Sequence, residues 1–223
     1  MKKVFCLVLT ALLIVGLVPA TTFADLDPVC KIGSKTYGSL EAALDDANSG
    51  AVIEILDDCE TDRLEILKNV TIVAADGVDA TLTLHGAVLI GDASNSCTVT
   101  FGSNSHGGML TIVPMEGADF RPIAIRGGST LNIKNGVALE GNSINNFGGM
   151  IFVQADATLN MFGGVIKDCS AYYGGAVSVS GTFNMFGGII TNCSAIYASD
   201  FDMSGRGGLL VLHIPELIIC LVV

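Results

Sequence analysis

Cysteines are the side chains of this sequence with the widest chemical potential, because thiols bind metal ions and form disulfides. Six of them follow residue 24: Cys30, Cys59, Cys97, Cys169, Cys193 and Cys220. None belongs to a CxxC pair or to a Cys/His spacing typical of zinc sites. The sequence therefore predicts no metal site, and it contains no motif that implies a cofactor.

Carboxylates are the next candidates, since positioned Asp and Glu side chains carry out general acid–base chemistry. Asp45-Asp46 and Asp57-Asp58 are adjacent pairs, but they lie near the N-terminus, and no such pair follows residue 58. Later carboxylates stand alone and do not recur at matching positions: Glu140, Asp156 and Asp168. We therefore predict no catalytic residue in this chain.

An internal repeat in the sequence indicates which fold holds these side chains. Residues 157–171 (ATLNMFGGVIKDCSA) realign on residues 181–195 (GTFNMFGGIITNCSA), with ten of fifteen positions identical. Self-similarity with a period of this length is typical of solenoids. A degenerate triplet of an apolar, a small polar and an apolar residue recurs more widely, as Leu82-Thr83-Leu84, Leu110-Thr111-Ile112, Leu131-Asn132-Ile133, Leu159-Asn160-Met161 and Phe183-Asn184-Met185.

The triplets alternate with a period of two, as strands with one buried face do. Their apolar residues would point inward, and their middle residues would form one outward polar ladder of candidate binding residues: Thr83, Thr111, Asn132, Asn160 and Asn184. Glycine pairs near the triplets permit the positive φ needed at sharp corners. The sequence therefore predicts an all-β fold, a right-handed parallel β-helix with about 25 residues per coil over residues 69–205. A β-sandwich is the alternative.

The segment before these coils, residues 25–68, is expected to cap the β-helix. Within it, residues 39–47 read SLEAALDDA, with Ser39 as a suitable N-cap. One face of the resulting short helix carries Leu40, Ala43, Leu44 and Ala47. A helix at this end would cover the apolar interior and the unpaired backbone of the first coil.

Residues 1–24 are predicted to be a secretory signal peptide, with Met1-Lys2-Lys3 before an apolar run from Val4 to Val18. This run is short for a bilayer span, so no membrane span is expected after cleavage. The chain carries a net charge of −11, which argues against nucleic acid and anionic lipid as partners, since both need clustered Lys and Arg. We therefore expect an extracellular or cell-surface location.

The C-terminal segment, residues 206–223, is atypical. From Leu209 it reads LLVLHIPELIICLVV, and His213, Pro215 and Glu216 divide it into two apolar pieces. Each piece is shorter than a bilayer span. Two explanations are open: the tail folds over the end of the domain, or a truncation or frameshift has altered the natural sequence here.

The stretch KIGSKTYGSLEAALDDANSGAVIEILDD, residues 31–58, resembles the opening of pectin-lyase-like β-helix domains in secreted bacterial surface proteins. The later copies of T-[LF]-N-M-F-G-G-x-I are similar to the coils of adhesin-like repeat proteins of that superfamily. The resemblance covers approximately residues 29–205. It implies a secreted or cell-surface protein whose partners are extracellular polysaccharides or other host and cell-surface polymers.

The same superfamily contains polysaccharide lyases and glycoside hydrolases, so an enzyme is the alternative function. Its lyases hold Ca²⁺ with carboxylates beside an Arg or Lys, and its hydrolases use paired carboxylates. The outward triplet positions of this chain are Thr and Asn, with only Asp202 of a weaker last copy charged. We therefore expect a non-catalytic, adhesin-like solenoid that binds through the polar ladder. Placement of Arg121 or Arg126 beside Glu140 or Asp156 would favour an enzyme instead.

Cys169 and Cys193 occupy the same position of the repeat, so we expect them to stack one coil apart. Their Cα separation would suit a disulfide, but stacked side chains keep their Cβ atoms near the coil spacing, slightly too far apart for a relaxed bridge. A disulfide and a stacked pair of thiols are both open. Cys30 and Cys59 flank the cap region and could staple it, since secretion permits oxidation.

Overall fold

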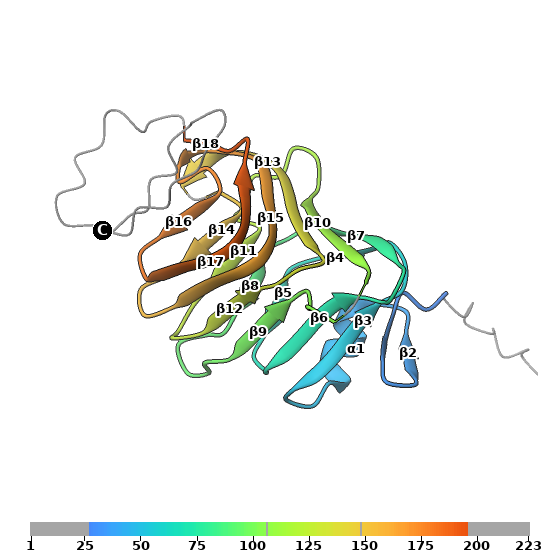
Figure 1. Ribbon diagram of the computed structural model, residues 1–223. Helices are drawn as coiled ribbons and strands as arrows, with labels where there is room; N and C mark the ends of the chain where they lie inside the picture. Colours follow the sequence, from blue (N-terminus) through green and yellow to red (C-terminus); the bar gives the residue numbers. More distant parts are fainter. Residues whose placement is uncertain (1–26, 106, 148, 196–223) are drawn as a thin grey trace, which may run out of the picture.

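The computed structural model describes residues 27–105, 107–147 and 149–195 (Figure 1). The predicted signal peptide (1–24) and apolar tail (206–223) lie outside these residues, as do Asp202 and Cys220. The described part is a parallel β-solenoid of about 5 turns with about 27 residues per turn. This architecture confirms the predicted all-β, parallel β-helix fold. Within the described ranges, no helix is long and apolar enough to cross a membrane.

Successive coils place their strands on three parallel stacks (Figure 1). We call the first two stacks the first and second sheets, although they are joined into one 13-stranded sheet, and the third stack is a separate 5-stranded sheet. The first sheet contains β3 (Ala51–Ile55), β6 (Val70–Ala74), β9 (Thr98–Phe101), β12 (Thr130–Ile133) and the beginnings of β15 (Thr158–Tyr173) and β17 (Thr182–Thr191). The second sheet contains β4 (Cys59–Thr61), β7 (Asp79–Leu84), β10 (Met109–Pro114), β13 (Val137–Phe147), the ends of β15 and β17, and β18 (Ser194–Ala195). The third sheet contains β5 (Leu64–Ile66), β8 (Val88–Ile90), β11 (Ile123–Ile125), β14 (Ile151–Val153) and β16 (Val177–Val179).

Two long strands join the first and second sheets, because β15 and β17 bend at a corner and pair within both. Gly164 of β15 has φ +72 at this corner, and Gly188 occupies the same place in β17 with φ +91. A Cβ atom on Gly188 would lie 2.5 Å from the carbonyl oxygen of Gly163. Glycine is therefore required by both dihedral angle and space, which confirms the glycine corner that the repeat predicts.

The N-terminal end is covered by a hairpin and a helix. β1 (Cys30–Ile32) pairs antiparallel with β2 (Lys35–Tyr37) and with β3. α1 (Leu40–Asp46) follows, and the hydroxyl of its N-cap Ser39 accepts a hydrogen bond of 3.2 Å from the backbone N–H of Ala42. The predicted capping helix is confirmed. Parallel stacking begins with Ala51 of β3 opposite Val70 of β6, before residue 69, the predicted start of the coils.

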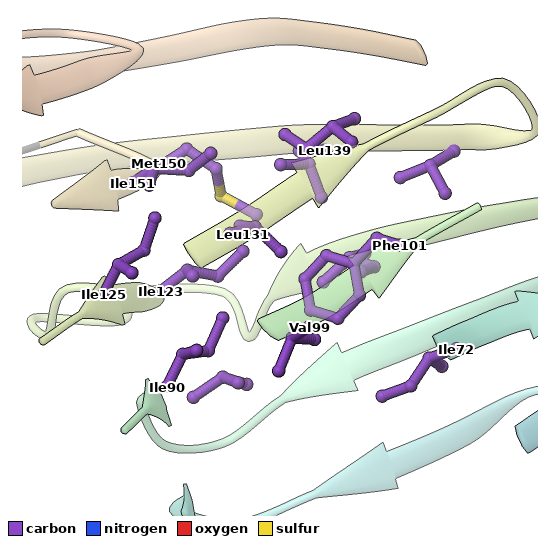
Figure 2. Close-up of a cluster of buried hydrophobic side chains, with 14 of the residues drawn as sticks. Ile72, Ile90, Val99, Phe101, Ile123, Ile125, Leu131, Leu139, Met150 and Ile151 are labelled. Atoms are coloured by element: carbon purple, nitrogen blue, oxygen red, sulfur yellow. The ribbon is translucent and has the colours of Figure 1, made fainter. Parts of the chain in front are cut away.

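The core fills the space between the three sheets (Figure 2). The first apolar residue of each predicted triplet points into it with a relative exposure of at most 3%: Leu82, Leu110, Leu131, Leu159 and Phe183. Burying one such side chain contributes roughly 1.5–3 kcal/mol. Since the triplet strands bury one face, their alternate residues are turned outward, where a ligand can reach them.

Candidate functional site

The structure divides the five predicted ladder residues between two sheets. Asn132, Asn160 and Asn184 lie opposite one another on the first sheet, in β12, β15 and β17. Thr83 and Thr111 lie on the second sheet, in β7 and β10, and they are not opposite each other. Thr83 faces Val113, whereas Thr111 faces Thr81. The prediction of one ladder from all five residues is therefore wrong, and their role in binding stays a prediction.

The error has a simple cause. Each coil contains more than one strand with an inward–outward–inward pattern, and period-two alternation is the same on every sheet. The triplets at Leu82 and Leu110 belong to the second strand of their coils, and the later triplets belong to the first. The first-sheet strands of the earlier coils read VTIVA and TVTF, so they lack the leucine-based triplet.

The three asparagines form a hydrogen-bonded ladder across neighbouring coils. The Nδ2 group of Asn184 donates to Oδ1 of Asn160 over 3.0 Å, and Asn160 donates likewise to Asn132 over 3.0 Å. Asn132 in turn reaches the hydroxyl of Thr100 at 3.5 Å. Because a carboxamide has two N–H donors and two acceptor lone pairs, the ladder uses only half of Asn160's capacity. The other N–H donor and the other acceptor lone pair of Asn160 stay available to a ligand, and the ladder hydrogen bonds hold the carboxamide in one orientation.

A second polar row runs beside this ladder, and sequence reasoning missed it. Thr98, Thr130, Thr158 and Thr182 are opposite one another through four successive coils. Each precedes the polar ladder position by two residues, so both point to the same side of the sheet. The signal was present as T-x-[TN] at the start of the last four first-sheet strands, β9, β12, β15 and β17. We call the two rows together the Thr/Asn face, consisting of Thr98, Thr100, Thr130, Asn132, Thr158, Asn160, Thr182 and Asn184.

Two aromatic rings continue this face at its C-terminal end. Phe162 and Phe186 follow Asn160 and Asn184 by two residues, at the corner where β15 and β17 bend. Their rings are stacked, with centroids 5.1 Å apart and planes at 12°. Their relative exposures are 44% and 69%, high for phenylalanine, a residue that is often fully buried. Sequence reasoning recognised both residues only as part of the repeat motif.

The second sheet presents a different outward surface. Glu140 and Lys167 are opposite each other on β13 and β15 and form an ion pair. The hydrogen bond and the charge of Glu140 raise the pKa of Lys167 above its ordinary value. Beside this pair, the row that begins with Thr81 and Thr111 continues into Ala138, Val165 and Ile189, so it changes from polar to apolar.

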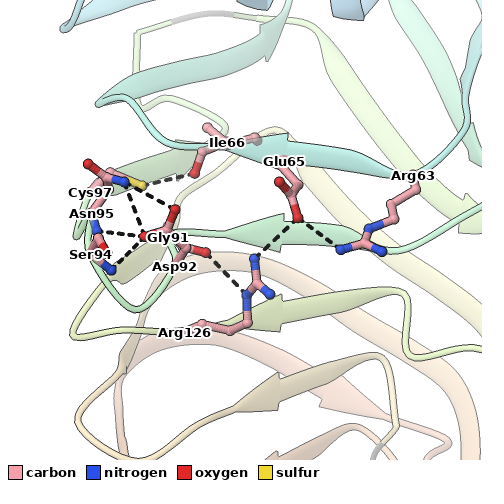
Figure 3. Close-up of polar contacts among 9 residues, drawn as sticks. All are labelled: Arg63, Glu65, Ile66, Gly91, Asp92, Ser94, Asn95, Cys97 and Arg126. Atoms are coloured by element: carbon pink, nitrogen blue, oxygen red, sulfur yellow. Dashed lines mark hydrogen bonds and ion pairs between the residues drawn. The ribbon is translucent and has the colours of Figure 1, made fainter.

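Arg121 and Arg126 would favour an enzyme if either lay beside Glu140 or Asp156, and the structure shows other contacts for them. Arg126 is on the third-sheet side, where its guanidinium is 3.6 Å from Glu65 and donates to the carbonyl of Gly91 over 3.1 Å (Figure 3). Arg121 lies over the ring of Phe152, 4.4 Å from its centroid. Glu140 pairs with Lys167. The arrangement that would have favoured an enzyme is therefore not formed by Arg126.

A hollow of about 340 Å³ lies beside the capping helix, lined by Glu41, Glu60, Thr61, Asp62 and His85. Glu60 and the Nε2 atom of His85 are 2.9 Å apart, and the Thr61 hydroxyl donates to the carboxylate of Glu41. Sequence reasoning did not single out this group. In residues 27–105, 107–147 and 149–195, no three His, Cys, Asp or Glu side chains are grouped so that they could hold a metal ion.

Cys169 and Cys193 stack as the repeat predicts, since their neighbours Ser170 and Ser194 are opposite each other. Both are buried thiols, and the five cysteines of the described residues include no disulfide. In the structure they are a stacked pair of thiols, and the disulfide between them stays a prediction. The hydrogen bond from Cys169 lowers the pKa of Cys193.

Cys30 and Cys59 are likewise present as thiols in the cap region, so the structure does not contain the staple considered from the sequence. Burial is the main reason why the pKa of Cys30 is raised to about 11 and that of Cys59 to about 12. The charge of Glu41 contributes to the raised pKa of Cys30, and the charges of Cys30 and Glu41 contribute to that of Cys59. These thiols are therefore poor nucleophiles at neutral pH.

Comparison with known proteins gives no relative on which a function could rest. No protein-family model matches the chain, and neither a curated protein nor a solved structure matches it.

Proposed function

We propose that this chain is a secreted or cell-surface, adhesin-like β-solenoid that binds extended polymers, polysaccharides above all, through the Thr/Asn face. The observation that carries the proposal is the register of that face. Four successive coils repeat a threonine, and the last three of them repeat an asparagine beside it, so that the same donors and acceptors recur over these three coils. Neighbouring coils are about 4.8 Å apart, so the face is a periodic array suited to a periodic ligand.

Repetition gives such a face its affinity. One hydroxyl or carboxamide contributes little to binding in water, because each protein–ligand hydrogen bond replaces one to solvent. Contacts linked along one polymer add up, since after the first contact the others form at high effective concentration. The hydrogen bonds between Asn132, Asn160 and Asn184 hold the side chains in place before binding, which lowers the entropic cost.

The proposed location follows from the sequence. A basic start, an apolar run and small residues before position 24 have the layout of a cleaved leader. Outward faces built of Thr and Asn rather than Lys and Glu keep the charged fraction at 15%, which suits a surface that contacts uncharged polymers.

A glycoside hydrolase is the second candidate, and the hollow beside α1 is the observation in its favour. Glu41, Glu60 and Asp62 line it together with His85, so carboxylates and a titratable imidazole share one depression. Hydrolysis requires two carboxyl groups on opposite sides of one glycosidic bond. Glu41 is already engaged by the Thr61 hydroxyl, and Glu60 by His85, so this function is less well supported than binding.

The test compares the same charge on two sheets. Thr158→Glu places a carboxylate in the middle of the Thr/Asn face, whereas Thr111→Glu places one on the second sheet, and both positions are half-buried. We expect Thr158→Glu to weaken retention of the secreted full chain on insoluble polysaccharides by about tenfold or more, and Thr111→Glu to leave it unchanged.

Circular dichroism and urea unfolding check that both variants fold. Equal loss in the two variants, or binding of the wild-type chain to no polysaccharide, contradicts the proposal. Release of reducing sugar that Glu60→Gln abolishes would establish the hydrolase instead.

A further inference from the structure

We infer that the polymer bound by the Thr/Asn face is an uncharged, extended β-linked glycan, lying along the solenoid axis with about one sugar per coil and packing against the Phe162–Phe186 pair. The inference rests on the proposed function and names its ligand class. Three independent features of the face lead to it: its charge, its spacing and its aromatic end.

The charge of the face selects against acidic polymers. None of the eight residues of the Thr/Asn face is ionisable, and the chain as a whole has a net charge of −11. Binding a polyuronate would bring a carboxylate on every sugar toward an acidic protein. Among the described residues, Lys134, two positions after Asn132, supplies one cation at this edge of the face, and the corresponding positions of the next two coils are Phe162 and Phe186. A neutral glycan has no such cost. Its hydroxyls exchange hydrogen bonds with hydroxyls and carboxamides, which are both donors and acceptors.

The spacing of the face sets the direction of the polymer. Equivalent side chains of adjacent coils repeat at about 4.8 Å along the axis, which is close to the length of one sugar residue in an extended β-linked chain. Each sugar of a polymer that runs along the axis therefore meets two side chains of the face: a threonine of the first row, and an asparagine or Thr100 of the second row. The four threonines in register from Thr98 to Thr182 accommodate four sugars, one at each coil.

The aromatic pair distinguishes a sugar from other neutral polymers. Pyranose rings with equatorial substituents present an apolar face of C–H groups, which packs on aromatic rings. Phe162 and Phe186 follow Asn160 and Asn184 by two residues, and their relative exposures of 44% and 69% leave their stacked rings accessible to a ligand. Their mutual stacking fixes both rings, so little side-chain entropy is lost when a sugar packs against them.

Binding of soluble oligosaccharides to the secreted full chain tests the inference. The probes are β-1,4-linked glucose oligomers of increasing length and, as the acidic comparison, galacturonic acid oligomers of equal length. We expect affinity for the neutral series to rise with length and to level off after about four sugars, one per coil. Phe186→Ala and Phe162→Ala should each raise Kd about tenfold. Met115→Ala, an exposed apolar residue outside the face (40% exposed), should leave Kd unchanged.

The outcomes separate this inference from the proposal beneath it. Tighter binding of the acidic series, or an unchanged Kd in both phenylalanine variants, overturns the inference and leaves polymer binding by the Thr/Asn face in place. Affinity that shows no length dependence overturns the axial arrangement. Failure of the wild-type chain to bind any polysaccharide removes the proposed function itself. Because both phenylalanines are partly exposed, each variant should lose only the stacking of the two rings and still unfold in one cooperative urea transition, which excludes misfolding as the cause of weaker binding.

Discussion

The first and second sheets are made by the same coils, and β15 and β17 even run through both, yet their outward surfaces differ. On the first sheet, threonine faces threonine and asparagine faces asparagine from coil to coil. On the second sheet, Thr83 faces Val113, and Glu140 faces Lys167. An outward polar residue therefore becomes part of a surface array only when the strand register places the same residue type opposite it in the next coil.

The first and second sheets share one hydrophobic core. Leu159 lies beneath the first sheet and Ile166 beneath the second, and both have 0% exposure in one continuous core. Their shared burial means that the sheets differ only in the side chains that face outward.

The largest effect is expected from this shared core. Leu159→Ala and Ile166→Ala should each lower the free energy of unfolding by about 2–5 kcal/mol, because each removes buried methyl groups and leaves a cavity. Urea unfolding followed by circular dichroism measures both. A loss confined to one of the two variants would show that the sheets do not share one cooperative core.

Substitutions on the two outward faces should lower the free energy of unfolding by different, smaller amounts. Asn160→Ala removes both of its ladder hydrogen bonds and leaves the half-buried amide groups of Asn132 and Asn184 without these partners. We expect a loss of about 1–3 kcal/mol in the free energy of unfolding. Thr111→Ala on the second sheet should change it by less than about 0.5 kcal/mol. Equal effects would mean that the ladder contributes nothing beyond an ordinary outward side chain.

The smallest effect concerns the ion pair of Glu140 and Lys167. The folded chain raises the pKa of Lys167 above its ordinary value of 10.5, so the folded state holds the proton more tightly than the unfolded state does. The resulting stabilisation is complete below the ordinary lysine pKa and is lost as the pH rises through the raised pKa of the folded state.

Glu140→Gln should therefore lower the urea midpoint slightly at neutral pH, and the difference from the wild-type chain should vanish in strongly alkaline solution. High salt should shrink the difference as well, because the pair is half-exposed. A difference that persists at alkaline pH would assign the effect of the substitution to packing rather than to charge.

The sequence by itself determined the solenoid, its inward residues, its capping helix and its glycine corner. The repeat at an offset of 24 indicates the solenoid, and the other features depend on local patterns: the alternation around Leu131 and Leu159, the N-cap at Ser39, and a glycine where φ is positive. Such patterns are set by the backbone geometry of a few neighbouring residues, so they can be read without knowing what lies next to them.

Only the tertiary structure decided which outward residues meet. Thr83 and Asn132 have the same local pattern but lie on different sheets, because the lengths of the intervening loops decide which strand stacks on which. The threonine row at Thr98, the stack of Phe162 on Phe186 and the engagement of Arg126 with Glu65 likewise depend on register between coils. Residues about 24 to 32 positions apart are brought within contact only by that register, and alternation along a single strand carries no information about it.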